Sequence, residues 1–124
     1  MEFRTAEEAR TANVTYHLVP VTYWQEHGTA EHYVPAAYDD EGFIHCTNGL
    51  DELVKVANLF YTGDPRDFQV MVLDVGKLTP ELRYDDPGEV YPHLYGPLNT
   101  AAVIGVLPVR RTADGAFVSI GGDE

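Results

Sequence analysis

The chain has 124 residues, of which 44% are hydrophobic and 11% aromatic, a composition typical of one globular domain and unlike that of a disordered chain. Its 20 acidic and 8 basic residues give a formal net charge of −12 at pH 7, so its field repels the phosphate backbone of a nucleic acid. Because no apolar run approaches the ~18 residues of a membrane span, and the first residues lack the apolar core of a signal peptide, we expect a cytoplasmic protein without membrane or nucleic-acid partners.

The first twelve residues are predicted to lie outside the folded domain. They are polar and rich in alanine, without a convincing apolar face, so we expect residues 1–12 to be a disordered leader. Residues 13–124 then form a single domain. Its one cysteine, Cys46, excludes an intrachain disulfide and a cysteine-rich zinc site, and we expect it to be a small buried hydrophobic residue.

The next segments predict a strand and a short helix. Residues 13–20 combine β-branched and aromatic side chains and end at a proline, which predicts a strand that carries His17. The eight residues that follow are expected to form a helix, with Thr22 as its N-cap and Gly28 as its end.

A second strand and the clearest helix of the sequence come next. The segment "GFIHCT" is short and β-prone, and its residues His45 and Thr47 are two positions apart, so they point to the same face. The segment "NGLDELVKVANLFYTG" has the i, i+3, i+4, i+7 apolar pattern of a helix with one buried face. Asn48 is its expected N-cap and Gly63 its expected end.

The second half of the chain predicts strands. The apolar run "FQVMVLDVGKL" is typical of a central strand covered on both faces, and a shorter strand is expected at "ELRYD". Residues 89–99 are expected to form a shaped loop, because Pro92 and Pro97 restrict the backbone. The last strands, "AAVIGVLPVRR" and "AFVSI", flank Asp114 and Gly115, a strong hairpin signal. Two helices and these strands predict an α+β domain with a mostly antiparallel sheet.

Three histidines interrupt otherwise apolar stretches and are the candidate chemical groups. A half-buried imidazole costs desolvation energy unless it is hydrogen-bonded, so we expect polar partners for His17, His45 and His93. His93 shares its parity with Tyr95, as His45 does with Thr47. If these side chains converge, they form a cleft with three imidazoles, a hydroxyl and a phenol. Such a cleft suits a neutral or anionic polar ligand better than the chemistry of a paired-carboxylate glycosidase.

Two other interpretations stay open. Each histidine alone also fits a hydrogen-bonded residue of the core, and residues 89–99 also fit a turn whose tyrosines pack the core. Three neutral imidazoles match the ligand number of a zinc site with an open fourth position. No His-x-His or His-x-x-x-His spacing supports such a site, so we expect no metal. The sequence has no glycine-rich phosphate loop, nucleophile elbow or dinucleotide fingerprint.

Several motifs together resemble a bacterial family, the domain of unknown function 952. They are "YHLVP", "EGFIHCT", "ANLFY", "VMVLDVGKL" and "YPHLYGPLN", and the resemblance spans about residues 14–120. The order of the histidine motifs is also distantly similar to the ADP-ribosyltransferase superfamily, especially its RNA 2′-phosphotransferase branch. That similarity implies a split α+β fold of two short, mostly antiparallel sheets, with NAD bound in the cleft between them.

The superfamily resemblance implies a role for each motif residue. His17 matches the first-strand residue that holds the NAD ribose, and His45 with Thr47 matches the second motif, which supports the nicotinamide ribose. His93 and Tyr95 occupy the third, catalytic motif. The implied cofactor-binding residues are therefore His17, Thr47 and Tyr95, and the implied catalytic residues are His45, His93 and Tyr95.

The match departs from the superfamily in two respects. Its third motif offers His93 and Tyr95 where protein-modifying transferases usually carry a glutamate, and the chain is acidic where the RNA-directed branch grips phosphates with arginines. We expect a nucleotide-like small molecule as partner, with NAD as substrate for transfer of ADP-ribose or cleavage of the nicotinamide glycosidic bond. A non-catalytic ligand-binding module is the alternative, followed by a histidine-based metal-dependent enzyme. The sequence leaves open the acceptor and whether the protein is a monomer or a small homo-oligomer.

Overall fold

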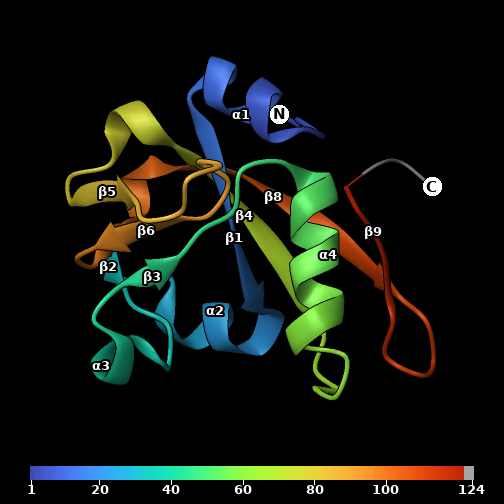
Figure 1. Cartoon of the computed structure of the whole chain (residues 1–124). Helices are drawn as coiled ribbons and strands as arrows, with labels where there is room; N and C mark the ends of the chain where they lie inside the picture. The colour runs from blue at the N-terminus through green and yellow to red at the C-terminus, as the bar shows by residue number, and fades with distance from the viewer. Residues whose placement is uncertain (122–124) are drawn as a thin grey trace.

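A computed structural model describes residues 1–121 of the chain (Figure 1). Its strands form three sheets, and every strand pair in them is antiparallel, so the α+β class and the antiparallel pairing predicted from the sequence are confirmed. Over the described range, no helix has the length and apolar character needed to cross a membrane. The elements in chain order are α1 (Ala6–Ala12), β1 (Val14–Pro20), α2 (Val21–His27), β2 (His32–Tyr33), α3 (Tyr38–Glu41), β3 (Ile44–His45), α4 (Leu50–Phe60), β4 (Phe68–Asp74), η1 (Val75–Lys77), β5 (Glu81–Tyr84), β6 (Pro92–Tyr95), β7 (Leu98–Asn99), η2 (Thr100–Ala102), β8 (Val103–Arg111) and β9 (Phe117–Ile120).

The largest sheet has four strands in the order β1-β4-β8-β9. Alternate residues of β4 face opposite sides of this sheet: Val70 and Val72 belong to one hydrophobic cluster, and Met71 and Leu73 belong to another. All four side chains are fully buried. The apolar run of β4 is thus covered on both faces, which confirms the predicted central strand, and the predicted hairpin of β8 and β9 is also present.

Helix α4 and the two smaller sheets pack on opposite faces of the large sheet (Figure 1). Leu53 of α4 joins the cluster on one face, and Leu94 of β6 joins the cluster on the other. The chain that follows β3 reaches the large sheet directly, because Thr47 forms an antiparallel bridge with Tyr16 of β1. This bridge places the histidine motifs of β1 and β3 side by side.

The first twelve residues are ordered, so the prediction of a disordered leader is wrong. Helix α1 begins with a capping box, in which the Thr5 side chain accepts the amide of Glu8 and the Glu8 carboxylate accepts the amide of Thr5. Ala9 is fully buried in the core beside β1. Local capping and the packing of one small residue therefore order a segment whose polar composition suggests disorder.

The start of α4 is held by the N-terminal segment instead of by a side chain. Gly49, and not the predicted Asn48, is its N-cap residue, and the amides of the first two helical residues donate to the carbonyl oxygens of Phe3 and Arg4 at 2.9 and 3.0 Å. The helix ends at Phe60, before the predicted glycine. Pro20, and not the predicted Thr22, is the N-cap residue of α2, and no side chain caps this helix.

Residues 89–99, expected as a loop, contribute two strands. β6 is the central strand of the three-stranded sheet β3-β6-β5, and β7 pairs with β2. Pro92 is the first residue of β6, where a missing amide is tolerated, and its carbonyl oxygen accepts the amide of Cys46 at 3.0 Å. The described chain has four α-helices instead of the two predicted; the additional helices are α1, in the segment expected to be disordered, and α3, which has only four residues.

Candidate functional site

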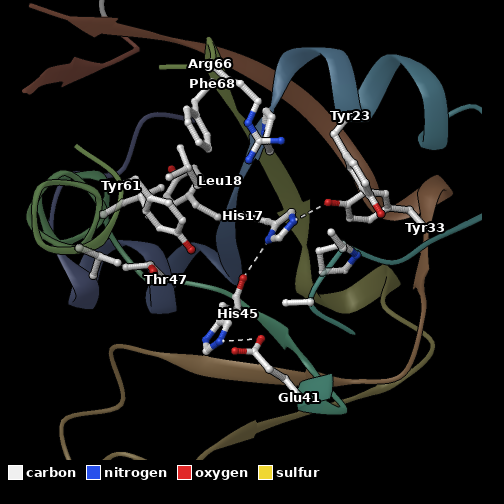
Figure 2. Close-up of a pocket in the computed structure, with 17 residues that line it drawn as sticks. His17, Leu18, Tyr23, Tyr33, Glu41, His45, Thr47, Tyr61, Arg66 and Phe68 are labelled. Atoms are coloured by element: carbon white, nitrogen blue, oxygen red, sulfur yellow. Dashed lines mark hydrogen bonds and ion pairs between the residues drawn. The ribbon is translucent and has the colours of Figure 1, made fainter. Parts of the chain in front are cut away.

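A cavity of about 270 Å³ opens beside β1, β3 and α4 (Figure 2). Aromatic rings and a few polar side chains line it. We term it the central cavity, and its lining residues are Tyr16, His17, Leu18, Pro20, Tyr23, Tyr33, Pro35, Ala36, Ala37, Glu41, His45, Thr47, Leu53, Val56, Tyr61, Arg66 and Phe68.

His17 lies in the wall of the cavity with both ring nitrogens bonded inside the protein (Figure 2). Nδ1 is 2.9 Å from the carbonyl oxygen of His45, and Nε2 is 3.0 Å from the hydroxyl of Tyr33. Because a carbonyl oxygen only accepts, Nδ1 carries the hydrogen and Nε2 accepts from Tyr33. Burial lowers the pKa of His17 to about 4, so the ring is neutral at pH 7. The polar partners expected for His17 are present.

His45 and Thr47 both line the cavity, as their spacing predicts. The His45 side chain is 57% exposed, and its Nε2 lies 3.1 Å from Oε1 of Glu41. The backbone of Thr47 is bonded to Tyr16 in both directions, at 2.9 and 3.0 Å. Its hydroxyl has no hydrogen-bond partner within residues 1–121 and faces the cavity (Figure 2).

Two further polar side chains of the lining come from outside the histidine motifs. The Tyr61 hydroxyl is without a hydrogen-bond partner in the part of the chain that the structure describes, and burial, followed by the charges of Glu41 and Asp64, raises the pKa of this phenol. Arg66 is held by Asp64, with Nη2 2.7 Å from Oδ2 and Nε 3.0 Å from Oδ1. The apolar spacing of the segment "NGLDELVKVANLFYTG" predicts that Tyr61 lies on the buried face of the helix, and it gives no sign that the Tyr61 hydroxyl reaches a cavity.

A second aromatic group lies on the outer face of the three-stranded sheet. Nδ1 of His93 is 3.2 Å from Oδ2 of Asp85, and the Tyr95 hydroxyl donates to the same oxygen at 2.7 Å. The ring of Phe43 stacks on His93 with centroids 4.0 Å apart and an interplanar angle of 11°. The hydrogen bond from Tyr95, and then that from His93, lowers the pKa of Asp85. We term these four residues the His93 cluster.

The predicted convergence of the site residues is therefore partial. The structure brings His17, His45 and Thr47 together at the central cavity, but His93 and Tyr95 do not line it. Both project from β6, which lies on the far side of β3 from the large sheet. The His93 ring contacts the His45 ring with centroids 5.1 Å apart, so the His93 cluster adjoins the cavity through His45.

Three contacts of these histidines were not predicted. Glu41 is four residues before His45, and Phe43 is two residues before it. The sequence spacing alone therefore suggests both contacts. Asp85 has no such signal, because its contact with His93 depends on the pairing of β5 with β6.

Other reactive groups are few. Cys46 is 3% exposed, and burial raises the pKa of its thiol to about 12, so it is the small buried residue that the sequence predicts. In the described residues, no three His, Cys, Asp or Glu side chains are grouped so that they hold a metal ion.

Comparison with known proteins identifies the family. Residues 18–106 match the family described as "Protein of unknown function (DUF952)". The crystal structure of protein CC0527 from Caulobacter crescentus is similar with a TM-score of 0.70 and 20% identity, over 85% of this chain and 93% of that chain. The solution NMR structure of CC0527 has a TM-score of 0.65 and 22% identity, over 83% and 90%. At this identity both structures show a shared fold alone.

Among curated proteins, none matches this chain significantly. The family match covers well over half of the chain, and its bounds include the motifs of β3, α4 and β6 and the end of β1 from Leu18 onward. The resemblance to the domain of unknown function 952 is thereby confirmed: this chain belongs to the DUF952 family.

Proposed function

We propose that this protein binds NAD or a related nucleotide, with the nucleoside end of the ligand in the central cavity. One observation carries the proposal: the hydroxyls of Thr47 and Tyr61 face an aromatic-walled cavity and have no hydrogen-bond partner among the residues described. Uncommitted polar groups that converge on an apolar pocket are the usual means of orienting a small ligand. His45 adds a third such group, because Glu41 occupies only its Nε2.

The walls of the cavity suit a planar ring. Tyr23, Tyr33, Tyr61 and Phe68 present aromatic surface to it, and such rings pack against a base or a nicotinamide by stacked or edge-on contact. A neighbouring hollow of about 580 Å³ shares His45 and other wall residues with the cavity. A ligand with a second moiety therefore has room to extend past His45.

The predicted site residues take different roles within this proposal. Thr47 and His45 would bind the ribose hydroxyls. His17 would act as a positioning residue, because its two nitrogens are used by His45 and Tyr33. His93 and Tyr95 lie outside the cavity, where they would meet an acceptor that approaches the sugar past His45.

The reaction we propose is cleavage of the nicotinamide glycosidic bond. The bond between ribose C1′ and the ring nitrogen breaks with its electron pair moving to nicotinamide, which leaves as a neutral molecule. An acceptor oxygen bonds to C1′, and its proton passes to an imidazole. His93 is suited to that step because Asp85 binds its Nδ1 and leaves the Nε2 lone pair free. The distant similarity of motif order to the ADP-ribosyltransferase superfamily supports this proposal.

A binding module without catalysis is the second candidate. It is favoured by the location of His93 and Tyr95, since only His45 of the predicted catalytic residues contacts the cavity. Release of free nicotinamide from NAD separates the two candidates.

The test is a titration of NAD, ADP-ribose and nicotinamide into the purified protein, followed by thermal unfolding and by NMR of the histidine rings. A ligand present at ~100 times its Kd stabilises the folded state by about 2.7 kcal/mol, an effect that thermal unfolding resolves. We expect stabilisation by NAD and a shift of the His45 signals. The absence of any response at millimolar concentrations would overturn the proposal.

A further inference from the structure

Large apolar side chains that face solvent gather at one end of α4. Among the described residues, eight such side chains are exposed, and four of them line the hollow of about 580 Å³ beside the central cavity. These four are Leu59, Phe60, Tyr61 and Tyr91. Single exposed apolar residues are normal on a protein surface, but a contiguous group of them marks an interaction surface. We term this group and the space that it lines the α4 hollow.

The last turn of α4 continues the apolar face of the helix beyond the core. Phe60 is seven residues after Leu53 and three after Ala57, so helical spacing places the three side chains on one face. Leu53 and Ala57 are buried. Phe60, in contrast, is 73% exposed, and the neighbouring Leu59 is 74% exposed. The described chain therefore leaves the end of this face uncovered, and both side chains are available to a partner.

The charges at the α4 hollow favour a positively charged partner. Glu41 belongs to its lining, and no lysine or arginine of residues 1–121 does. Glu52 accepts a hydrogen bond from the Tyr91 hydroxyl at 3.5 Å and also pairs with Lys55 at 3.4 Å, so this nearby cation is already neutralised. Because the whole chain has a formal charge of −12, a second copy would bring the same carboxylates to the contact and be repelled.

The exposure of Leu59 and Phe60 favours a protein segment over a small molecule. A pocket for a small molecule encloses most of its ligand, whereas these two side chains of the wall project into solvent. A protein segment has side chains of its own that pack around such projections, as an amphipathic helix does when it binds an apolar surface. We propose that the α4 hollow binds a segment of another protein whose apolar side chains are flanked by lysine or arginine.

The α4 hollow directly adjoins the central cavity. Both are lined by Glu41, His45, Thr47, Val56 and Tyr61. A docked segment would therefore cover the side of the cavity at His45 and exclude a ligand that extends past this residue. The inference does not rest on the proposed function, because the apolar group and the charges beside it are the same whether or not the cavity binds a nucleotide.

A pair of synthetic peptides tests this inference with the full chain. One peptide combines leucine and lysine in the order of an amphipathic helix, and the other has glutamate in place of each lysine. We expect fluorescence anisotropy to show binding of the lysine peptide, roughly tenfold weaker binding of the glutamate peptide, and a loss of affinity with added salt. Phe60→Ser should weaken binding of the lysine peptide about tenfold. Val118→Ser is the matched control, since Val118 is 49% exposed on β9 and lies outside the hollow.

Thermal unfolding verifies that Phe60→Ser is folded, and Leu59→Ser takes its place if it is not. Failure of the lysine peptide to bind, or equal binding of both peptides, overturns the inference. Binding that Phe60→Ser and Val118→Ser weaken equally, or that neither weakens, reflects the net charge alone and also overturns it. Self-association in sedimentation that Phe60→Ser abolishes would overturn it in favour of a second copy. None of these results depends on NAD, so the nucleotide proposal stands or fails separately.

Discussion

His45 and His93 lie directly opposite each other on β3 and β6, with ring centroids 5.1 Å apart and ring planes at 89°. Their neighbours Ile44 and Leu94 are also paired and are fully buried, so the two imidazoles point to the outer face of the sheet. His45 therefore belongs to the wall of the central cavity and also contacts the His93 cluster. Changes in the cluster are expected to reach the cavity through this ring contact.

Acid is expected to destabilise the protein through His17. Because its folded pKa of about 4 lies below the ordinary value of 6.5, the unfolded chain binds more protons between these values. The contribution of neutral His17 to the free energy of unfolding is fully present above pH 6.5. It is lost as the pH falls towards 4, by roughly 3 kcal/mol in total. Denaturant unfolding of the wild type and of His17→Gln across this range measures the effect.

The His17→Gln variant should show a clearly smaller loss of stability on acidification than the wild type. His32→Gln is the matched control, because it makes the same substitution at an exposed histidine. A His17→Gln variant with the full wild-type pH dependence would exclude this histidine as its source.

Gly49→Ala is expected to destabilise the protein at the junction between the N-terminal segment and α4. Gly49 has a φ of +94°, and an added Cβ would lie 2.7 Å from the carbonyl carbon of Thr5. Both the backbone strain and the clash oppose the substitution, so we expect the free energy of unfolding to fall by about 1–3 kcal/mol. Gly63→Ala, whose Cβ meets nothing within 4 Å, should change it by less than about 0.5 kcal/mol.

Tyr95→Phe is expected to raise the pKa of Asp85 towards its ordinary value. The Tyr95 hydroxyl is the largest cause of the lowered pKa, and His93 contributes less. A lowered carboxyl pKa stabilises the folded state at neutral pH, and this contribution is lost as pH falls through the folded pKa; in the variant the loss should begin at higher pH. NMR titration of the Asp85 carboxyl carbon measures the change, with Tyr38→Phe as control. An unchanged titration would contradict the hydrogen bond.

Thr47→Val should weaken ligand binding without weakening the fold. Valine keeps the shape of the side chain, and the Thr47 hydroxyl has no hydrogen-bond partner in the described range, so unfolding should be nearly unaffected while the affinity for NAD falls about tenfold. Thr15→Val provides the contrast. The Thr15 hydroxyl is fully buried and donates to the carbonyl oxygen of Thr47, so its loss should cost about 1 kcal/mol of stability and leave the affinity largely intact. Calorimetry and denaturant unfolding of both variants distinguish these results, and unchanged affinity in Thr47→Val would remove Thr47 from the site.

Much of the fold was predictable because its signals are local. The continuous apolar run of β4, the apolar periodicity of α4 and the Asp114-Gly115 turn each lie within one segment. The parity of His45 and Thr47 predicts that they share one face, and both line the central cavity. The burial of Cys46 also followed from its residue type.

The same sequence determined less about the N-terminal segment and the candidate site. Polar composition predicts disorder for residues 1–12, but Ala9 packs against the core and the backbone of Phe3 and Arg4 binds the start of α4. Those contacts join segments that are far apart in the chain, so no local pattern reports them.

What the sequence by itself determined about this protein is its family, its α+β class and the polar partners that its histidines require. Only the tertiary structure decided that His93 and Tyr95 lie beside the cavity instead of in it. Parity determines which side chains share a face of a strand, but the partner strands of β6 determine what that face meets. The pairing of β6 with β3 and β5 is a long-range contact, and it assigns the two residues to the outer face of the sheet.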